Sequence, residues 1–93
     1  MNTRIVINPN LSDLTQKEIE VILWIATEYK KAKTKHPHWP DNPIEQAAIV
    51  CEESGELIRA ALQRKYEGID TDDELEKEAI QTGAMAMRFL VNL

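Results

Sequence analysis

The chain has 93 residues with no break in composition, which predicts a single domain, residues 1–93, whose own core covers its apolar surface incompletely. Sixteen acidic residues against eleven basic ones give a net charge of −5, so nucleic acid is not expected as a partner. A single cysteine provides no intrachain disulfide framework, and no run approaches the ~20 apolar residues of a membrane span, so we expect a cytoplasmic protein without membrane contact.

Residues 1–14 are expected to form an extended N-terminal arm, because a β-prone run at 4–7 is ended by an Asn-Pro-Asn turn sequence. Thr15 and Glu18 then have the spacing of a capping box, in which each side chain bonds to the other residue's backbone amide. The sequence therefore predicts that the first helix begins at Thr15, and an apolar stripe along it predicts a core-facing side.

Residues 36–43 carry three of the four prolines, which predicts a stiff loop after the first helix. Asn42 followed by Pro43 has the sequence of an N-cap and a proline at the first helical position. Glu45 would complete a reciprocal cap. We expect the second helix to run from about Ile44 to Tyr66.

Gly68 and the polar residues that follow it predict the next turn, where Thr71 and Glu74 offer another capping box. The third helix should run from about Asp72 to Leu93. The predicted fold class is all-α, with three main helices in a helical hairpin-based bundle. We expect oligomerisation to complete a four-helix-type core, because the end of the third helix is apolar almost all round.

A cluster of carboxylates occupies the second helix at Glu52, Glu53 and Glu56, with spacings of three and four residues between its members. Like charges so placed oppose helix formation, and no basic residue lies between Lys35 and Arg59 to relieve them. A bound divalent cation would remove the conflict. Magnesium is the expected ion because it takes oxygen ligands from carboxylates, water and phosphates.

The third helix carries a second oxygen-bearing stripe at Glu74, Glu78 and Gln81. In an antiparallel hairpin this stripe would face the first cluster, so the two helices together could hold the ion. A glutamate-rich helix is also commonly just a solvated face, and that alternative stays open.

These segments resemble a known family, the MazG-like all-α nucleoside triphosphate pyrophosphohydrolases. The sequence EESGEL at 52–57 is similar to the family's EExxE motif, and KEAIQTGAMAMRFL at 77–90 lies where the family carries ExxD. The resemblance implies magnesium binding by Glu52, Glu53, Glu56 and Glu78, with manganese as a substitute ion. The family's final aspartate falls at Gln81, whose amide oxygen is a poorer ligand.

The activity that the resemblance implies is magnesium-dependent hydrolysis of a nucleoside triphosphate between the α and β phosphates, giving monophosphate and pyrophosphate. Glu53 or Glu56 would activate the attacking water. A homodimer or homotetramer is expected. Two alternatives stay open: a nucleotide-binding module with little turnover, and a purely structural helical oligomerisation module.

Four further residues are candidates for substrate contact. His38 and Trp39 lie in the proline-rich loop and could stack on a nucleobase, although packing of the loop onto the bundle is an equal alternative. Lys77 and Arg59 could bind the outer phosphates, as could other basic residues of the second and third helices, although an exposed solvated face is the alternative for each of them. The others are Arg64, Lys65 and Arg88.

Overall fold

The computed structural model describes residues 13–68 and 72–93, and its regular secondary structure within them is entirely helical. Three long helices follow one another, α1 (Gln16–Lys35), α2 (Pro43–Leu62) and α3 (Asp72–Val91), and a π-helical turn, η2 (Gln63–Glu67), extends α2. The all-α prediction is confirmed. Most of the predicted arm at 1–14 and the predicted cap at Thr71 lie outside the described residues. No helix in the described ranges combines the length and apolar character needed to cross a membrane.

The capping box at the start of α1 is formed as predicted. The Thr15 amide donates to Glu18 Oε1 at 2.7 Å, and the Glu18 amide donates to Thr15 Oγ1 at 3.1 Å. Two of the four otherwise unsatisfied donors of the first turn are thereby paired, so the helix begins where the sequence indicates.

Asn42 caps α2 with Pro43 at the first helical position, as predicted. Its Oδ1 accepts from the Ile44 amide at 2.7 Å and from the Glu45 amide at 3.4 Å. The predicted reciprocal bond to the Glu45 side chain is wrong, because that carboxylate is exposed and accepts no bond from the Asn42 amide.

The predicted regular helix from Ile44 to Tyr66 is wrong in its last turn, which widens into η2. Gly68 causes the change, because it adopts a left-handed conformation with φ of 62° and its amide donates to Gln63 O, five residues back. Across the following turn, Arg64 Nη1 lies 2.7 Å from Asp72 Oδ1 and joins the end of η2 to the start of α3.

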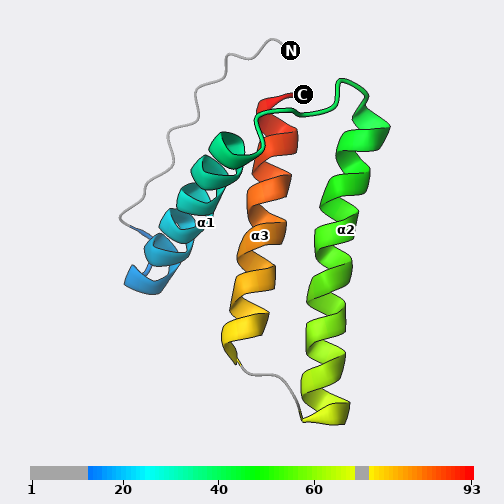
Figure 1. Ribbon diagram of the computed structural model, residues 1–93. Helices are drawn as coiled ribbons and strands as arrows, with labels where there is room; N and C mark the ends of the chain where they lie inside the picture. The colour runs from blue at the N-terminus through cyan, green and yellow to red at the C-terminus, as the bar shows by residue number, and fades with distance from the viewer. Residues whose placement is uncertain (1–12, 69–71) are drawn as a thin grey trace.

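α3 is the central helix of the fold, and it packs against both α1 and α2 (Figure 1). α2 and α3 run antiparallel, which confirms the predicted hairpin, whereas α1 and α2 flank α3 without packing on each other in the described residues. Small residues permit this close approach. Ala84 is fully buried, and a Cβ atom added to Gly83 would lie 2.9 Å from Ile25 Cδ1 on α1.

Arg88 of α3 is only 4% exposed and holds the C-terminal end of α1. Its Nη2 donates to His36 O at 2.7 Å, and its Nη1 donates to Ala32 O at 3.4 Å. The Trp39 ring stacks on its other side, with 4.7 Å between the guanidinium carbon and the ring centroid. The positive charge is therefore balanced by the negative end of the α1 dipole, and the interpretation of Arg88 as a solvated residue is wrong.

A second buried polar side chain fixes the other half of the loop. Gln46 of α2 is 5% exposed and its Nε2 donates to Pro40 O at 2.6 Å. With Arg88 bound to the His36 carbonyl, the connection between α1 and α2 is held to both remaining helices, in agreement with the stiff loop expected from its prolines.

Replacing Arg88 with Met should lower the free energy of unfolding by about 2 kcal/mol, because two partly buried carbonyls at the end of α1 lose their donor. Urea denaturation followed by circular dichroism measures this difference. Arg59→Met removes an equally long cation from the surface of α2 and should change stability by less than about 0.5 kcal/mol. Equal losses in the two variants would show that the Arg88 bonds do not stabilise the fold.

Candidate functional site

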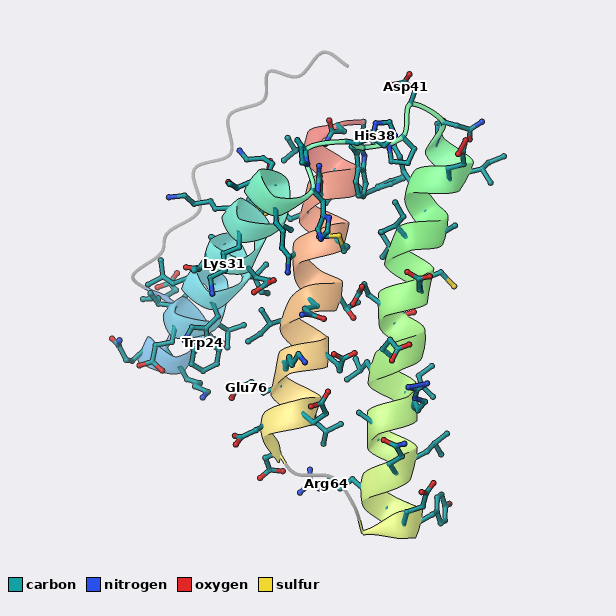
Figure 2. The ribbon with its side chains drawn as sticks, viewed as in Figure 1. Trp24, Lys31, His38, Asp41, Arg64 and Glu76 are labelled. Atoms are coloured by element: carbon teal, nitrogen blue, oxygen red, sulfur yellow. The ribbon has the colours of Figure 1, made fainter. Side chains whose placement is uncertain are left out.

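A cavity of about 500 Å³ lies over α3, between α1 and α2, and the connection from His36 to Trp39 closes one end. Because α1 and α2 do not pack on each other, α3 forms the floor and the two outer helices form the walls. The lining residues are Glu28, Lys31, Ala32, Lys35, His36, His38, Trp39, Ile49, Glu53, Gln81, Met85 and Arg88. Figure 2 shows Lys31 projecting from α1 and His38 in the connection that passes the C-terminal end of α3.

Helical periodicity explains why these side chains meet. Glu28, Lys31 and Lys35 recur at spacings of three and four on α1, so they lie on one face. Gln81 and Arg88 are seven residues, or about two turns, apart on α3, so the floor extends roughly 10 Å between them. The cavity thus has an end near Gln81 and an opposite end near Arg88 and the loop.

Carboxylates on all three helices act electrostatically on the half-buried side chain of Glu53. The pKa of Glu53 is raised above its ordinary value, first by burial and then by the negative charges of Glu78, Glu52, Glu56 and Glu28. The sequence predicted that carboxylates of the second and third helices would face each other. The structure adds Glu28 of α1, whose charge also raises the pKa of Glu53.

Glu78 is the most deeply buried of these carboxylates, with 7% exposure. It precedes Gln81 by one turn on α3, and it has no hydrogen-bond or ion-pair partner among the described residues. Burying a carboxylate without a partner is costly, and a bound cation would relieve the cost. The predicted approach of Glu78 to Glu53 is supported by their electrostatic interaction.

Glu52 and Glu56 differ from Glu53 in position, although all three were expected to share one side of the helix. Both are exposed and neither lines the cavity. Glu56 Oε2 instead lies 3.6 Å from Arg59 Nη2, one turn along α2. A rotation of 100° per residue separates Glu53, which points toward α3, from Glu52 on the flank of the helix.

Within the described residues, no three His, Cys, Asp or Glu side chains lie close enough together to hold a metal ion. The groups that would hold one are oxygen donors only: the carboxylates of Glu53 and Glu78, and the Gln81 amide oxygen. Such a set suits a hard cation such as magnesium, which completes its coordination with water and phosphate oxygens.

The four predicted substrate residues fall into two pairs. His38 and Trp39 line the cavity, whereas Arg59 and Lys77 do not. The Trp39 ring also packs on Arg88. Its place in the cavity lining supports stacking on a nucleobase, and its contact with Arg88 supports packing of the loop onto the bundle. Its indole Nε1 is buried without a hydrogen-bond partner among the described residues, which is an unfavourable position for a donor.

The sequence interpretation missed the contribution of α1 to the cavity. Glu28, Lys31 and Lys35 of α1 were not among the predicted site residues, yet they form one wall. Their regular spacing was visible in the sequence, but nothing there showed that this face turns toward the second helix across a gap. Positive charge therefore reaches the cavity from Lys31 and Lys35 of α1 and from Arg88 of α3, and not from Arg59 or Lys77.

Comparison of the chain with known protein families, with curated proteins and with solved structures gives no match.

The raised pKa of Glu53 predicts how stability depends on pH. The folded state binds this proton more tightly than the unfolded state, so the free energy of unfolding falls as the pH rises from the unfolded pKa through the raised one. Glu53→Gln should therefore be more stable than wild type at about pH 7 without metal, and this advantage should shrink at about pH 4. Urea denaturation in a chelating buffer at each pH measures it.

Glu52→Gln is the control, because it removes one exposed carboxylate from the same turn of α2. Its stability should stay within about 0.5 kcal/mol of wild type at both pH values. A Glu53→Gln variant that is less stable than wild type at neutral pH would contradict the proposed charge conflict.

Proposed function

We propose that the cavity binds a nucleoside triphosphate with magnesium and that the chain hydrolyses the bond between its α and β phosphates. One observation carries this proposal: a single cavity has carboxylates near one end, lysines along one wall, and an aromatic side chain at the other end. A nucleotide bound to a metal ion has the matching order of groups, namely the cation, the phosphates and the base.

The carboxylate end supports metal binding. Glu53 and Glu78 carry an unfavourable concentration of negative charge, which a divalent cation would neutralise. In the proposal these two residues and Gln81 bind magnesium, or manganese in its place, while Glu52 and Glu56 add negative charge from the flank. The ion supplies neutralisation of phosphate charge and polarisation of phosphorus, and Glu53 or Glu56 orients the attacking water.

Lys31 and Lys35 support the phosphate part of the proposal. Both line the cavity on α1, opposite Glu53 on α2. Their ammonium groups would contact the outer phosphates, the role first assigned to Arg59 and Lys77. His36, from the same end of α1, also lines the cavity and adds a donor.

The loop end suits a nucleobase. Trp39 is held by stacking on Arg88, so its position is fixed before any ligand arrives. His38 lies beside it in the same connection and lines the cavity. A base with a carbonyl group would also supply the acceptor that Trp39 Nε1 lacks, after a small movement of the ring.

A second candidate is a nucleotide-binding module without turnover. Two observations favour it: three carboxylates do not converge within the described residues, and Gln81 stands where the MazG-like pattern has an aspartate. Both candidates assume a cytoplasmic homodimer or homotetramer. They share the cavity and differ in whether bound triphosphate is cleaved, so one assay separates them.

Magnesium with a triphosphate at about 100 times its dissociation constant should raise the free energy of unfolding by about 2.7 kcal/mol, because the ligand binds only the folded chain. A panel of canonical and modified triphosphates should release pyrophosphate with at least one member. Glu53→Gln should lower that rate by about 100-fold or more, since it removes a carboxylate from both metal and water.

Glu45→Gln is the matched control, because it removes an exposed carboxylate from the first turn of the same helix. Stabilisation without pyrophosphate release would favour the binding module. No stabilisation by magnesium and any triphosphate would reject both candidates and leave the structural alternative.

The lysine wall predicts a separate effect. Lys31→Ala with Lys35→Ala should weaken triphosphate binding by about tenfold or more, because both ammonium groups line the cavity. Lys30→Ala with Lys33→Ala changes the net charge equally but alters neither lining residue. Isothermal titration of each double variant with a magnesium–triphosphate complex measures the difference. Equal weakening in both would indicate only a general charge effect.

A further inference from the structure

The face of α2 that points away from α3 carries a continuous row of apolar and small side chains. They recur at alternating spacings of four and three residues, and each is exposed. We call this row the outer stripe, and its residues are Ile44, Ala48, Cys51, Gly55, Ile58 and Leu62. The stripe repeats every seven residues, at 44, 51 and 58 and at 48, 55 and 62, and such a repeat is typical of helices that pack along their whole length against another helix.

The outer stripe is unusually exposed for its composition. Ile44 is 78% exposed, Ile58 60% and Leu62 51%. On the opposite side of α2, Gln46 and Ala60 are buried against the rest of the fold. α2 is therefore apolar on a side that this chain leaves uncovered.

The described part of the chain has little other apolar burial to stabilise it. Its buried hydrophobic residues are Tyr29, Ala60 and Ala84, and no large side chain is fully buried there. A domain of this size depends on nearly all of its apolar surface for a few kcal/mol of stability. Covering the outer stripe would supply burial that the three helices lack.

Residue size along the stripe favours another helix as the cover. The large side chains lie toward its ends, whereas Ala48, Cys51 and Gly55 occupy its centre. A Cβ atom added to Gly55 would meet nothing within 4 Å, so no contact inside this chain requires glycine there. Glycine inside a helix costs about 1 kcal/mol relative to alanine. Close approach of another backbone explains why that cost is accepted.

Charges beside the stripe identify the partner and its direction. One flank has Glu45 and Glu52 in the first half and Arg59 in the second half. The Arg59 side chain is 67% exposed, so it can reach outward from its contact with Glu56. In an antiparallel pair of identical helices this flank meets itself. In the register proposed below, each Glu45 approaches the partner's Arg59, whereas the two Glu52 side chains meet near the two-fold axis, so the dimer gains two attractive charge pairs against one repulsive pair. In a parallel pair it meets the other flank, which is Ala47, Ser54 and Ala61 and offers no charge.

We propose that the outer stripe binds a second copy of this chain, with the two α2 helices antiparallel and the two-fold axis midway between Cys51 and Gly55. In this register Ile44 packs on the partner's Leu62, Ala48 on the partner's Ile58, and Cys51 on the partner's Gly55. The two α2–α3 hairpins then form a four-helix layer. The interface lies on the opposite side of α2 from Glu53, so it is independent of the nucleotide proposal.

Cysteine cross-linking of the metal-free protein tests the register. Gly55→Cys should form a covalent dimer with two disulfides on mild oxidation, because each new thiol faces Cys51 of the partner subunit. The wild type should not cross-link, since its two Cys51 residues are offset by four residues, about 6 Å along the axis, in addition to the 8–10 Å between helices. Non-reducing electrophoresis reads the result.

Cys51→Ser combined with Gly55→Cys is the control and should stay uncross-linked, because it leaves one thiol per chain in offset positions. Efficient cross-linking of the wild type through Cys51 would overturn the antiparallel arrangement in favour of a parallel one. Cross-linking of the double variant as efficient as that of Gly55→Cys alone would overturn the register.

Sedimentation velocity tests the surface itself. Ile58→Glu with Leu62→Glu should convert a dimer to a monomer of unchanged helicity, because both side chains point away from α3. Ile22→Glu with Leu23→Glu changes two exposed apolar residues of α1 and should leave the dimer intact. A wild-type chain that sediments as a monomer at about 100 μM would reject the proposal, as would dissociation of the α1 variant alone.

Discussion

A single buried guanidinium determines how the rest of the structure is arranged. Arg88 binds the carbonyls at the C-terminal end of α1 and stacks on Trp39, so it fixes both the position of α1 and the course of the loop. No acidic partner appears among its described contacts. The dipole of α1 takes that role, which couples the charge on one helix to the end of another. Without this contact the closed end of the cavity would lose its support.

The cavity follows from that constraint and from the choice of small residues on α3. Gly83 and Ala84 let α1 and α2 approach the central helix, and the outer helices then stand on either side of a floor. The walls differ in charge: α1 contributes two lysines, while Glu53 on α2 lies among carboxylates. In the absence of a ligand this arrangement costs stability. It is the kind of arrangement that binding sites maintain, because the ligand offsets the cost.

Local sequence signals predicted the helix caps. They did not predict which side chains are buried by contacts between segments distant in the sequence. The bonds of Thr15 with Glu18 and of Asn42 with its two amides depend on neighbours in sequence, so they could be identified. The burial of Arg88 and Gln46 could not, because each depends on a carbonyl presented by a loop whose path the sequence does not specify. For the site, Glu53, Gln81, His38 and Trp39 were identified from spacing and position. The α1 wall was missed because it depends on how α1 crosses α3.

α2 contributes both to the cavity, through Glu53, and to the outer stripe. Its carboxylate Glu53 turns inward and its apolar residues Ile44, Ile58 and Leu62 turn outward, whereas Ile49, Val50 and Leu57 are partly covered by the rest of the fold. Glu53 lines the cavity and supports the ligand proposal, whereas Ile44, Ile58 and Leu62 are exposed and support the proposal of a second copy. The composition of one helix therefore accounts for both proposals without making either depend on the other.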